Sequence, residues 1–202
     1  MNVYEAAINR RTIRRFKQKP IPFKTLKKLV NAGSLAPSSA NLQPIEYVVI
    51  DEADLVKKVF GTLKWAGYIS PAGDPPPGER PVAYIIVLTN KNKNPGNCER
   101  DAAAAIENMI LVALEEGIGS CWLGSIDINK LTDILKLPEH IKIDSVLALG
   151  YSNESPQVEE MKDSVKYWKD ETGTLHVPKR GLEDVLFYNK YSTRVLPTES
   201  YL

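Results

Sequence analysis

The fold is decided by the stretch Asp101-Ala-Ala-Ala-Ala-Ile-Glu-Asn-Met-Ile-Leu-Val-Ala-Leu-Glu-Glu116. From Ala102 to Leu114 only Glu107 and Asn108 are polar, so apolar side chains surround a predicted helix on almost every side. Such a helix must be buried, and it is too short to span a bilayer, which needs about 20 apolar residues. We therefore expect it to be covered by its own chain or by a second subunit.

The two ends of this stretch also indicate structure. Its four consecutive alanines are small enough to let another helix approach closely. Asp101 suits an N-cap or a first-turn carboxylate, and Gly117 suits the residue that ends the helix. The segment 117–127 then predicts a tight turn and a strand with small residues, where backbone could meet a flat ligand. The alternative is a helix stop that feeds a strand with Cys121 and Trp122 in the core.

Composition indicates an ordinary soluble globular protein, with 202 residues, 43% hydrophobic and 25% charged. The net charge of +1 means that any anion site must be local. The two cysteines, Cys98 and Cys121, and the two histidines, His140 and His176, lack metal-ligand spacing, so we expect neither a disulfide framework nor a metal site. The N-terminus has no apolar leader segment, so we expect a cytoplasmic protein without a membrane partner.

Working outward from the central helix, strands and helices alternate along the chain. Apolar runs predict strands at 46–50, 82–88, 120–126 and 143–150. Helical spacing predicts helices at 3–11, 23–33, 52–60, 129–135 and 182–187. A hairpin is expected within 165–177, a polar connection at 154–160, a proline-rich loop at 61–81 and a polar tail at 188–202. The pattern predicts an α+β or α/β domain with a mixed sheet.

The densest positive charge lies near the N-terminus, in Arg10-Arg-Thr-Ile-Arg-Arg-Phe16. Guanidinium groups pair bidentately with phosphate, and Thr12 adds a hydroxyl donor. Whether helical or extended, Arg10, Thr12 and Arg14 can converge on one anion. A solvated basic surface is the plainer interpretation. A nucleic-acid patch is a third, and it is weakened by the near-neutral net charge and by the lack of a groove-reading module.

A second polar segment is Pro37-Ser-Ser-Ala-Asn-Leu-Gln-Pro44. Its carboxamides supply a donor and an acceptor together, which suits the edge of a heterocycle that bears both C=O and N–H groups. The alternative is a turn whose serine and asparagine side chains cap neighbouring backbone. Near the C-terminus, Lys179 and Arg180 follow Pro178; in isolation they are an ordinary surface pair.

Several catalytic motifs are absent from the sequence. There is no Gly-x-Gly-x-x-Gly, no Gly-x-x-x-x-Gly-Lys-Ser/Thr and no Gly-x-Ser-x-Gly, so neither a dinucleotide fingerprint, a P-loop nor a nucleophile elbow is present. Two dispersed histidines make a hydrolytic triad a poor candidate. If the protein is an enzyme, an organic cofactor is expected to supply the reactivity.

Taken together, these segments resemble the nitroreductase family of flavin mononucleotide enzymes. The arginine stretch resembles the family's N-terminal phosphate-binding motif, and Leu35 to Pro44 resembles its Ala-Pro-Ser-x-x-Asn-x-Gln-Pro motif. The stretch from Asp101 through Trp122 resembles its long central helix and the strand after it, and Pro178-Lys-Arg180 resembles the basic pair that closes on the phosphate. The resemblance covers nearly the whole chain.

The resemblance implies an α+β, nitroreductase-like fold over a single domain, 1–202, with a central mixed or antiparallel sheet flanked by helices and a long buried helix at a dimer interface. It implies a homodimer with two sites at the subunit interface. The expected FMN-binding residues of one subunit are Arg10, Arg11, Thr12, Arg14, Lys179 and Arg180. Those of the other are Pro37, Ser38, Ser39 and Asn41. Gly124 and Ser125 would offer backbone N–H groups to the flavin ring.

The implied activity is FMN-dependent oxidoreduction, in which hydride passes from NADH or NADPH through non-covalently bound flavin to a small organic acceptor such as a nitroaromatic or a quinone, by a ping-pong mechanism. No side chain is expected to act as a catalytic residue. The proline-rich loop at 61–81 departs from the family pattern, with Lys64, Trp65 and Arg80 as candidate contacts. The alternatives are reductive dehalogenation, flavin consumption, or a non-catalytic flavin-binding or nucleic-acid-binding module.

Overall fold

The computed structural model describes residues 1–191. They form two compact units, one from Met1 to Glu154 and one from Ser155 onward, and each unit is described by itself. The single domain expected over 1–202 stays a prediction, and the expected tail at 188–202 lies mostly outside the described residues.

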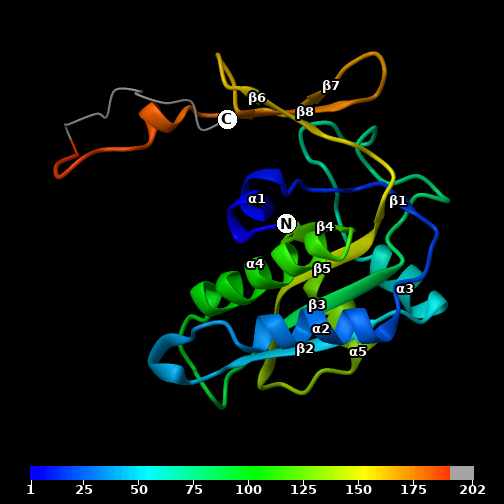
Figure 1. The fold of residues 1–202 in the computed structure, drawn as a ribbon. Coiled ribbons are helices and arrows are strands. Elements are labelled where there is room, and N and C mark those ends of the chain that lie inside the picture. The colour runs from blue at the N-terminus through cyan, green and yellow to red at the C-terminus, as the bar shows by residue number, and fades with distance from the viewer. Residues whose placement is uncertain (192–202) are drawn as a thin grey trace. The chain divides into compact units, whose positions relative to one another are not determined.

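A five-stranded sheet forms the centre of the first unit (Figure 1). Four strands run in the order β1-β5-β3-β2, and β4 also pairs with β5. Every pairing between these strands is antiparallel, which makes the fold α+β as predicted. The strands are β1 (Phe16–Lys17), β2 (Ile45–Ile50), β3 (Ala83–Asn90), β4 (Ile118–Leu123) and β5 (Ile141–Ser152).

The helices of the first unit lie close to their predicted positions. They are α1 (Val3–Asn9), α2 (Phe23–Ser34), the 3-10 helix η1 (Ser39–Asn41), α3 (Ala53–Phe60), α4 (Glu99–Glu115) and α5 (Ile128–Leu135). No helix in residues 1–191 is long and apolar enough to cross a membrane.

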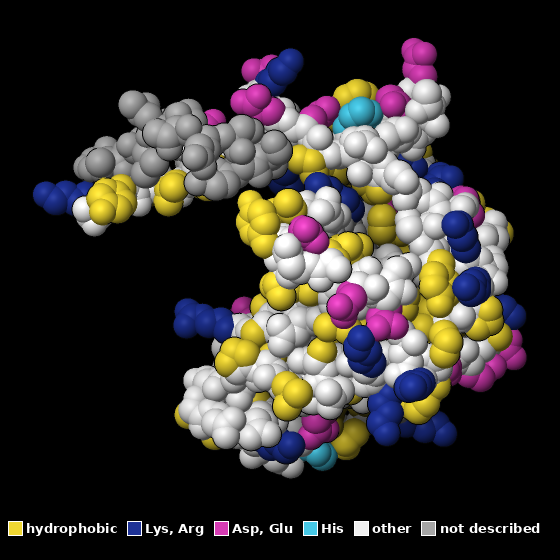
Figure 2. Space-filling view, in the orientation of Figure 1, with side chains coloured by type: hydrophobic (Ala, Val, Ile, Leu, Met, Phe, Trp, Pro, Cys, Tyr) yellow, Lys and Arg dark blue, Asp and Glu magenta, His cyan; other side chains and the backbone are white. Residues whose placement is uncertain are grey.

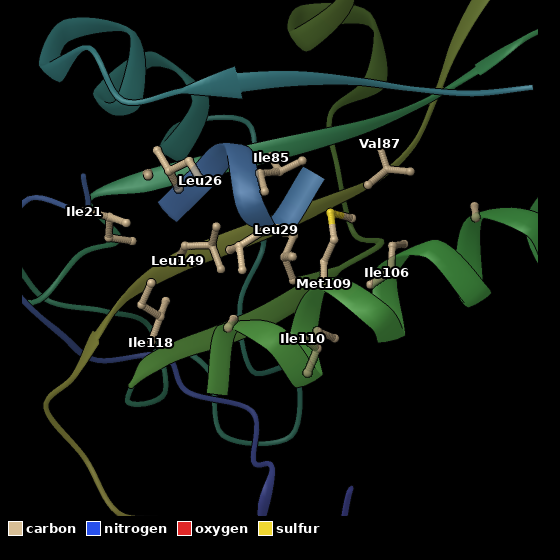
Figure 3. Packing of buried hydrophobic residues seen from close by; sticks show 14 residues of the cluster. Ile21, Leu26, Leu29, Ile85, Val87, Ile106, Met109, Ile110, Ile118 and Leu149 are labelled. Carbon is tan, nitrogen blue, oxygen red and sulfur yellow. The ribbon is translucent and has the colours of Figure 1, made fainter. Parts of the chain in front are cut away.

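Helices α2 and α4 pack against one face of the sheet and enclose the main core. Figure 3 shows Leu29 of α2 and Met109 of α4 close to Ile85 of β3. The alternate β3 residues Tyr84 and Ile86 belong to the opposite face and are also fully buried. Burial on both faces explains the continuous apolar run of this strand.

The central helix α4 is buried on one side by its own chain. Its core face consists of Ala102, Ala105, Ile106, Met109, Ile110 and Ala113, whereas Leu111, Val112 and Leu114 remain partly exposed. Gly33 lets α2 approach closely, because a Cβ there would lie 3.0 Å from Met109 Cγ. The helix stops before Gly117, whose φ of +70° is the expected left-handed conformation. Asp101 lies in the first turn, and Cys98 holds the N-cap position.

The second unit contains a small sheet in the order β6-β8-β7. The expected hairpin forms between β7 (Trp168–Lys169) and β8 (Leu175–Lys179), which pair antiparallel. The prediction of a mere connection at 154–160 is wrong, because Gln157–Glu160 forms β6 and pairs parallel with β8. The helix predicted at 182–187 is only a 3-10 turn, η2 (Leu182–Asp184).

A cluster around His176 joins the strands of this small sheet. Its Nε2 atom lies 3.1 Å from Asp170 Oδ2, and its Nδ1 atom lies 3.4 Å from Glu159 Oε2. Its ring stacks on Trp168, with centroids 4.3 Å apart. The hydrogen bonds from Thr172 and with His176 lower the pKa of Asp170 to about 2. The charged form of Asp170 is therefore favoured in the folded sheet.

Acid should loosen this small sheet. Because the folded pKa of Asp170 lies below its usual value of 3.8, its carboxylate stabilises the fold above that pH, and this contribution is lost as the pH falls toward about 2. We expect the fluorescence of Trp168, taken as the difference from a Trp168→Phe variant, to change in that window. The step should vanish in Asp170→Asn and persist in Asp163→Asn, an exposed control. Identical titrations of wild type and Asp170→Asn would contradict the assignment.

Candidate functional site

The arginine segment, residues 10–16, connects α1 to β1 and lies beside β4. Thr12 forms an isolated parallel bridge with Ser120, and the Ile13 N–H donates to the Ser120 carbonyl at 2.8 Å. The segment ends by pairing Phe16 with Ser152 of β5. The sheet thus holds most of the segment in an extended conformation.

Two glycines allow this segment to lie flat against the sheet. A Cβ on Gly119 would lie 2.9 Å from Ile13 Cβ, and one on Gly150 would lie 2.7 Å from Phe16 Cδ1. Ile13 and Phe16 are buried, whereas the arginines around them remain partly exposed. The apolar residues therefore anchor the segment and leave its cations at the surface.

The arginines have different local partners. Arg10 Nε lies 3.6 Å from Glu107 Oε1 on α4, and Arg11 donates from Nη1 to the Ile8 and Arg10 carbonyls at 2.7 and 2.6 Å. Arg11 thus caps the end of α1. Burial, and then the charge of Arg10, lower the pKa of Arg11 below its ordinary value. A bound anion would offset the repulsion between these two cations.

The exit of β4 presents open backbone. Gly124 and Ser125 are exposed, and a Cβ added at Gly124 would meet no atom within 4 Å. Gly124 follows Ser120, the neighbour of Thr12, by four positions, which is about 13 Å along a strand at 3.3 Å per residue. One strand therefore carries a basic segment at one point and an open glycine farther along. Trp122, which the alternative interpretation assigned to the core, is 43% exposed.

The proline-rich loop begins beside this exit. The Lys64 N–H donates to the Ser125 carbonyl at 3.0 Å, and Leu63 bridges Ile126. Lys64 is exposed, and its backbone lies next to the open glycine, so among the three candidate contacts of the loop it is the one that pairs with this exit. The sequence predicts a strand at 120–126 but only a loop from residue 61, so the periodicity of the sequence could not reveal that the two pair.

The other two loop candidates serve packing. Trp65 is buried and stacks on Phe60 with ring centroids 5.6 Å apart. The Arg80 guanidinium carbon lies 4.1 Å from the centroid of the same Phe60 ring. Both ends of the loop thus pack around Phe60, the last residue of α3.

The Ser-Asn segment, residues 37–44, uses its polar side chains locally. Ser38 Oγ accepts from the Gln43 N–H at 3.0 Å, and Asn41 Oδ1 accepts from Gln43 Nε2 at 3.2 Å. Ala40, Asn41 and Gln43 have left-handed φ values of 48°, 55° and 49°. Each costs roughly 1–2 kcal/mol when the residue is not glycine. Such strain is typical of binding sites, although the observed hydrogen bonds also fit the capping-turn alternative.

Asp101 anchors this segment to α4. Its Oδ1 atom accepts from the Ser39 N–H at 3.1 Å, and its side chain is buried. A cavity of about 150 Å³ adjoins the segment and is lined in part by Ser38, Tyr47 and Asp101. Burial raises the pKa of Tyr47 to about 12, so this phenol is neutral in the cavity wall. Pro37 is exposed at the cavity edge.

One protomer does not bring the two predicted halves of the site together. The arginine segment meets α4 at Glu107, whereas the Ser-Asn segment meets it at Asp101, six positions earlier and about 9 Å away along the axis. Figure 1 shows η1 and β1 at opposite sides of the first unit.

The C-terminal basic pair belongs to the second unit. The Lys179 carbonyl accepts from the Met161 N–H at 2.7 Å, and Arg180 Nη2 donates to the Asp184 carbonyl at 2.5 Å. Both side chains are exposed. Their approach to the arginine segment stays a prediction.

The thiol on β4, that of Cys121, is a poor nucleophile. Cys121 and Cys98 are free and buried, and burial raises the pKa of Cys121 to about 12. Its thiol is therefore protonated at neutral pH. Among residues 1–191, no three histidine, cysteine or acidic side chains group as ligands for a metal ion.

Comparison with known proteins identifies relatives of this chain. Residues 7–72 and 78–151 match the model described as the Nitroreductase family. A Thermus thermophilus protein named NADH dehydrogenase is 30% identical, over 74% of this chain and 86% of that protein. A Staphylococcus aureus protein named NADPH-dependent oxidoreductase is 26% identical, over 94% and 74%. A Desulfovibrio desulfuricans structure in complex with FMN has a TM-score of 0.66 at 24% identity, over 81% of this chain and 93% of that chain. This last likeness shows the fold.

Replacing Gly150 with alanine should destabilise the first unit by about 1–3 kcal/mol, because overpacking a buried site typically costs that much. The free energy of urea unfolding measures the effect. Gly61→Ala is the matched control, since its Cβ would lie at an ordinary 3.5 Å from the Lys58 carbonyl oxygen. If both variants unfold like wild type, Phe16 does not rest on Gly150.

Proposed function

Because this chain belongs to the nitroreductase family, we propose that it is an oxidoreductase that binds FMN non-covalently and passes hydride from NADH or NADPH to a small organic acceptor. The names of its relatives, NADH dehydrogenase and NADPH-dependent oxidoreductase, support both nicotinamide donors. The observation that carries the proposal is β4, which runs from the basic segment at Thr12 to the open backbone at Gly124.

The residues along β4 fit a ligand with a phosphate at one end and a flat ring at the other. Partly exposed guanidinium groups flank Thr12, and they suit a phosphate dianion. Gly124 has no side chain and no neighbour within 4 Å of a Cβ position, so a planar group can approach its backbone. The backbone of Lys64 is bonded to Ser125, so its exposed side chain would bring a positive charge to that end.

Within the proposed site, each group binds or orients. Arg10, Arg11, Thr12 and Arg14, with Lys179 and Arg180, would hold the phosphate and the ribityl chain, and the backbone at Gly124 and Ser125 would face the ring. FMN, when bound, supplies the hydride chemistry. No side chain acts as a nucleophile, which agrees with the protonated, buried thiol of Cys121. The Lys64 ammonium would stabilise negative charge near the ring.

A second copy of the chain would complete the site. Beside α1 and α4 lies a cavity of about 350 Å³, lined in part by Val3, Leu111 and Val112. Val3 is 77% exposed and Tyr4 58%, and Figure 2 shows hydrophobic side chains over α1. A partner subunit would cover this apolar surface and bring its own Pro37, Ser38, Ser39 and Asn41 to the arginine segment. This accounts for a central helix that is apolar on nearly all sides.

Stopped-flow mixing tests the function. The purified protein, loaded with FMN and mixed anaerobically with NADH or NADPH, should lose its visible flavin absorbance within one turnover. Adding a nitroaromatic or a quinone should then restore it. A yellow protein that neither nucleotide bleaches contradicts the proposed reductase activity and favours flavin binding without nicotinamide-driven turnover. A protein that binds no FMN excludes the whole proposal.

Subunit complementation tests the shared site. Arg14→Ala should weaken FMN binding roughly 10- to 100-fold, since a hydrogen bond to a charged group contributes about 1.5–3 kcal/mol. Asn41→Ala should weaken it by roughly 2- to 10-fold, as expected for a neutral hydrogen bond.

When the two variants are unfolded, mixed and refolded, heterodimers should regain one intact site, because the unmodified Arg14 and Asn41 then meet across the interface. Equilibrium FMN titration should show about a quarter of the sites with wild-type affinity, as random pairing of two subunits requires. A mixture with only weak sites would place both residues in one subunit's site, and a flavin-loaded monomer by sedimentation would contradict the dimer.

A further inference from the structure

Besides Glu107, two further carboxylates contact the arginine segment, where an anion site would not need them. Glu154 Oε1 accepts hydrogen bonds from two successive backbone N–H groups, that of Arg14 at 2.5 Å and that of Arg15 at 3.2 Å. Glu154 is itself held by Ser152, whose Oγ donates to the Glu154 carbonyl at 2.5 Å. Asn153, which lies between Ser152 and Glu154, donates its N–H to the Arg15 carbonyl at 2.9 Å. The residues that follow β5 therefore hold the backbone of the arginine segment through three hydrogen bonds.

The second carboxylate comes from the end of the proline-rich loop. Glu79 Oε2 lies 2.9 Å from Arg15 Nη1, and Glu79 Oε1 accepts from Asn153 Nδ2 at 2.6 Å. The Glu79 carbonyl accepts from the Phe16 N–H at 2.9 Å. The start of the same loop is tied to Ser125 through Lys64. The loop therefore connects the exit of β4 to the arginine segment.

Considered by charge alone, Glu154 and Glu79 should weaken the binding of an anion at this segment. A negative group beside a phosphate site raises the energy of the bound anion, so removing it should tighten binding. The geometry predicts that removing the Glu154 side chain weakens anion binding instead. Two backbone N–H groups would lose their acceptor, and the segment would no longer be held in one conformation. The two effects have opposite signs, which makes them separable by experiment.

We propose that Glu154 is a positioning residue for the phosphate-binding segment: its carboxylate fixes the backbone at Arg14 and so aims the Arg14 side chain at the anion. This inference rests on the proposed function, in which that anion is the FMN phosphate. Glu79 supports the same segment through the side chain of Arg15 and the backbone of Phe16. The proline-rich loop thereby helps to hold the cofactor-binding segment in place.

Two substitutions separate position from charge. Glu154→Gln removes the charge and keeps an oxygen acceptor, so it should bind FMN at least as tightly as wild type. Glu154→Ala removes both and should bind FMN about tenfold more weakly, the loss expected for charge-assisted hydrogen bonds. Glu139→Ala, which removes an exposed carboxylate elsewhere in the first unit, is the matched control and should match wild type. If Glu154→Ala binds FMN as tightly as wild type or more tightly, the positioning role is overturned.

A double-mutant cycle excludes a general loss of structure. In an Arg14→Ala background, Glu154→Ala should cause little further loss of FMN affinity, because the group that it positions is gone. Its effect on the thermal unfolding midpoint should be the same in both backgrounds. Equal fold-losses of affinity in both backgrounds would overturn the inference. A wild-type protein that binds no FMN would overturn the proposed function as well, whereas normal binding by Glu154→Ala overturns this inference alone.

Discussion

The packing of α4 against the sheet is the constraint on which the rest of the first unit depends. Its small residues let α2 and the strands come close, and its buried face supplies much of the core. Both polar segments contact this helix: Arg10 pairs with Glu107, and the Ser39 N–H donates to Asp101. The two attachments lie about 9 Å apart along the axis. A single α4 therefore holds two half-sites apart, and the partly exposed side of the helix is where a second subunit would join them.

The arginine segment must keep several cations close together and still have an ordered backbone. Clustered cations repel one another, yet the segment must remain ordered. Burial of Ile13 and Phe16 over Gly119 and Gly150 orders the segment through packing. Carboxylates order it further, by accepting backbone N–H groups and pairing with Arg15. Charge is thus balanced around the backbone of the segment, while several guanidinium groups remain partly exposed for an anion.

Much of the fold follows from the pattern of the sequence. The apolar run of β3 and the helical spacing of α2 and α4 predict those elements to within a few residues, because burial and periodicity act locally. β6 was missed, since Gln157–Glu160 is polar and its pairing with β8 is set by tertiary contact. The pairing of Lys64 with Ser125 was also not predicted, because Lys64 lies in a loop, and a loop has no periodic pattern that indicates its partner. Motif matching named the arginine and Ser-Asn segments and implied that they come from different subunits, but the pattern of the sequence did not show which residues of α4 each segment contacts.

The open backbone at Gly124 has a practical consequence for protein engineering. Its φ lies outside the left-handed range, and the space around a Cβ is empty, so side chains of increasing size can be installed there without disturbing the hydrophobic interior. Such a series of substitutions would progressively fill the space at the end of β4. A cysteine at the same position would accept a spectroscopic label, and the two native thiols, both buried, would compete poorly for the reagent.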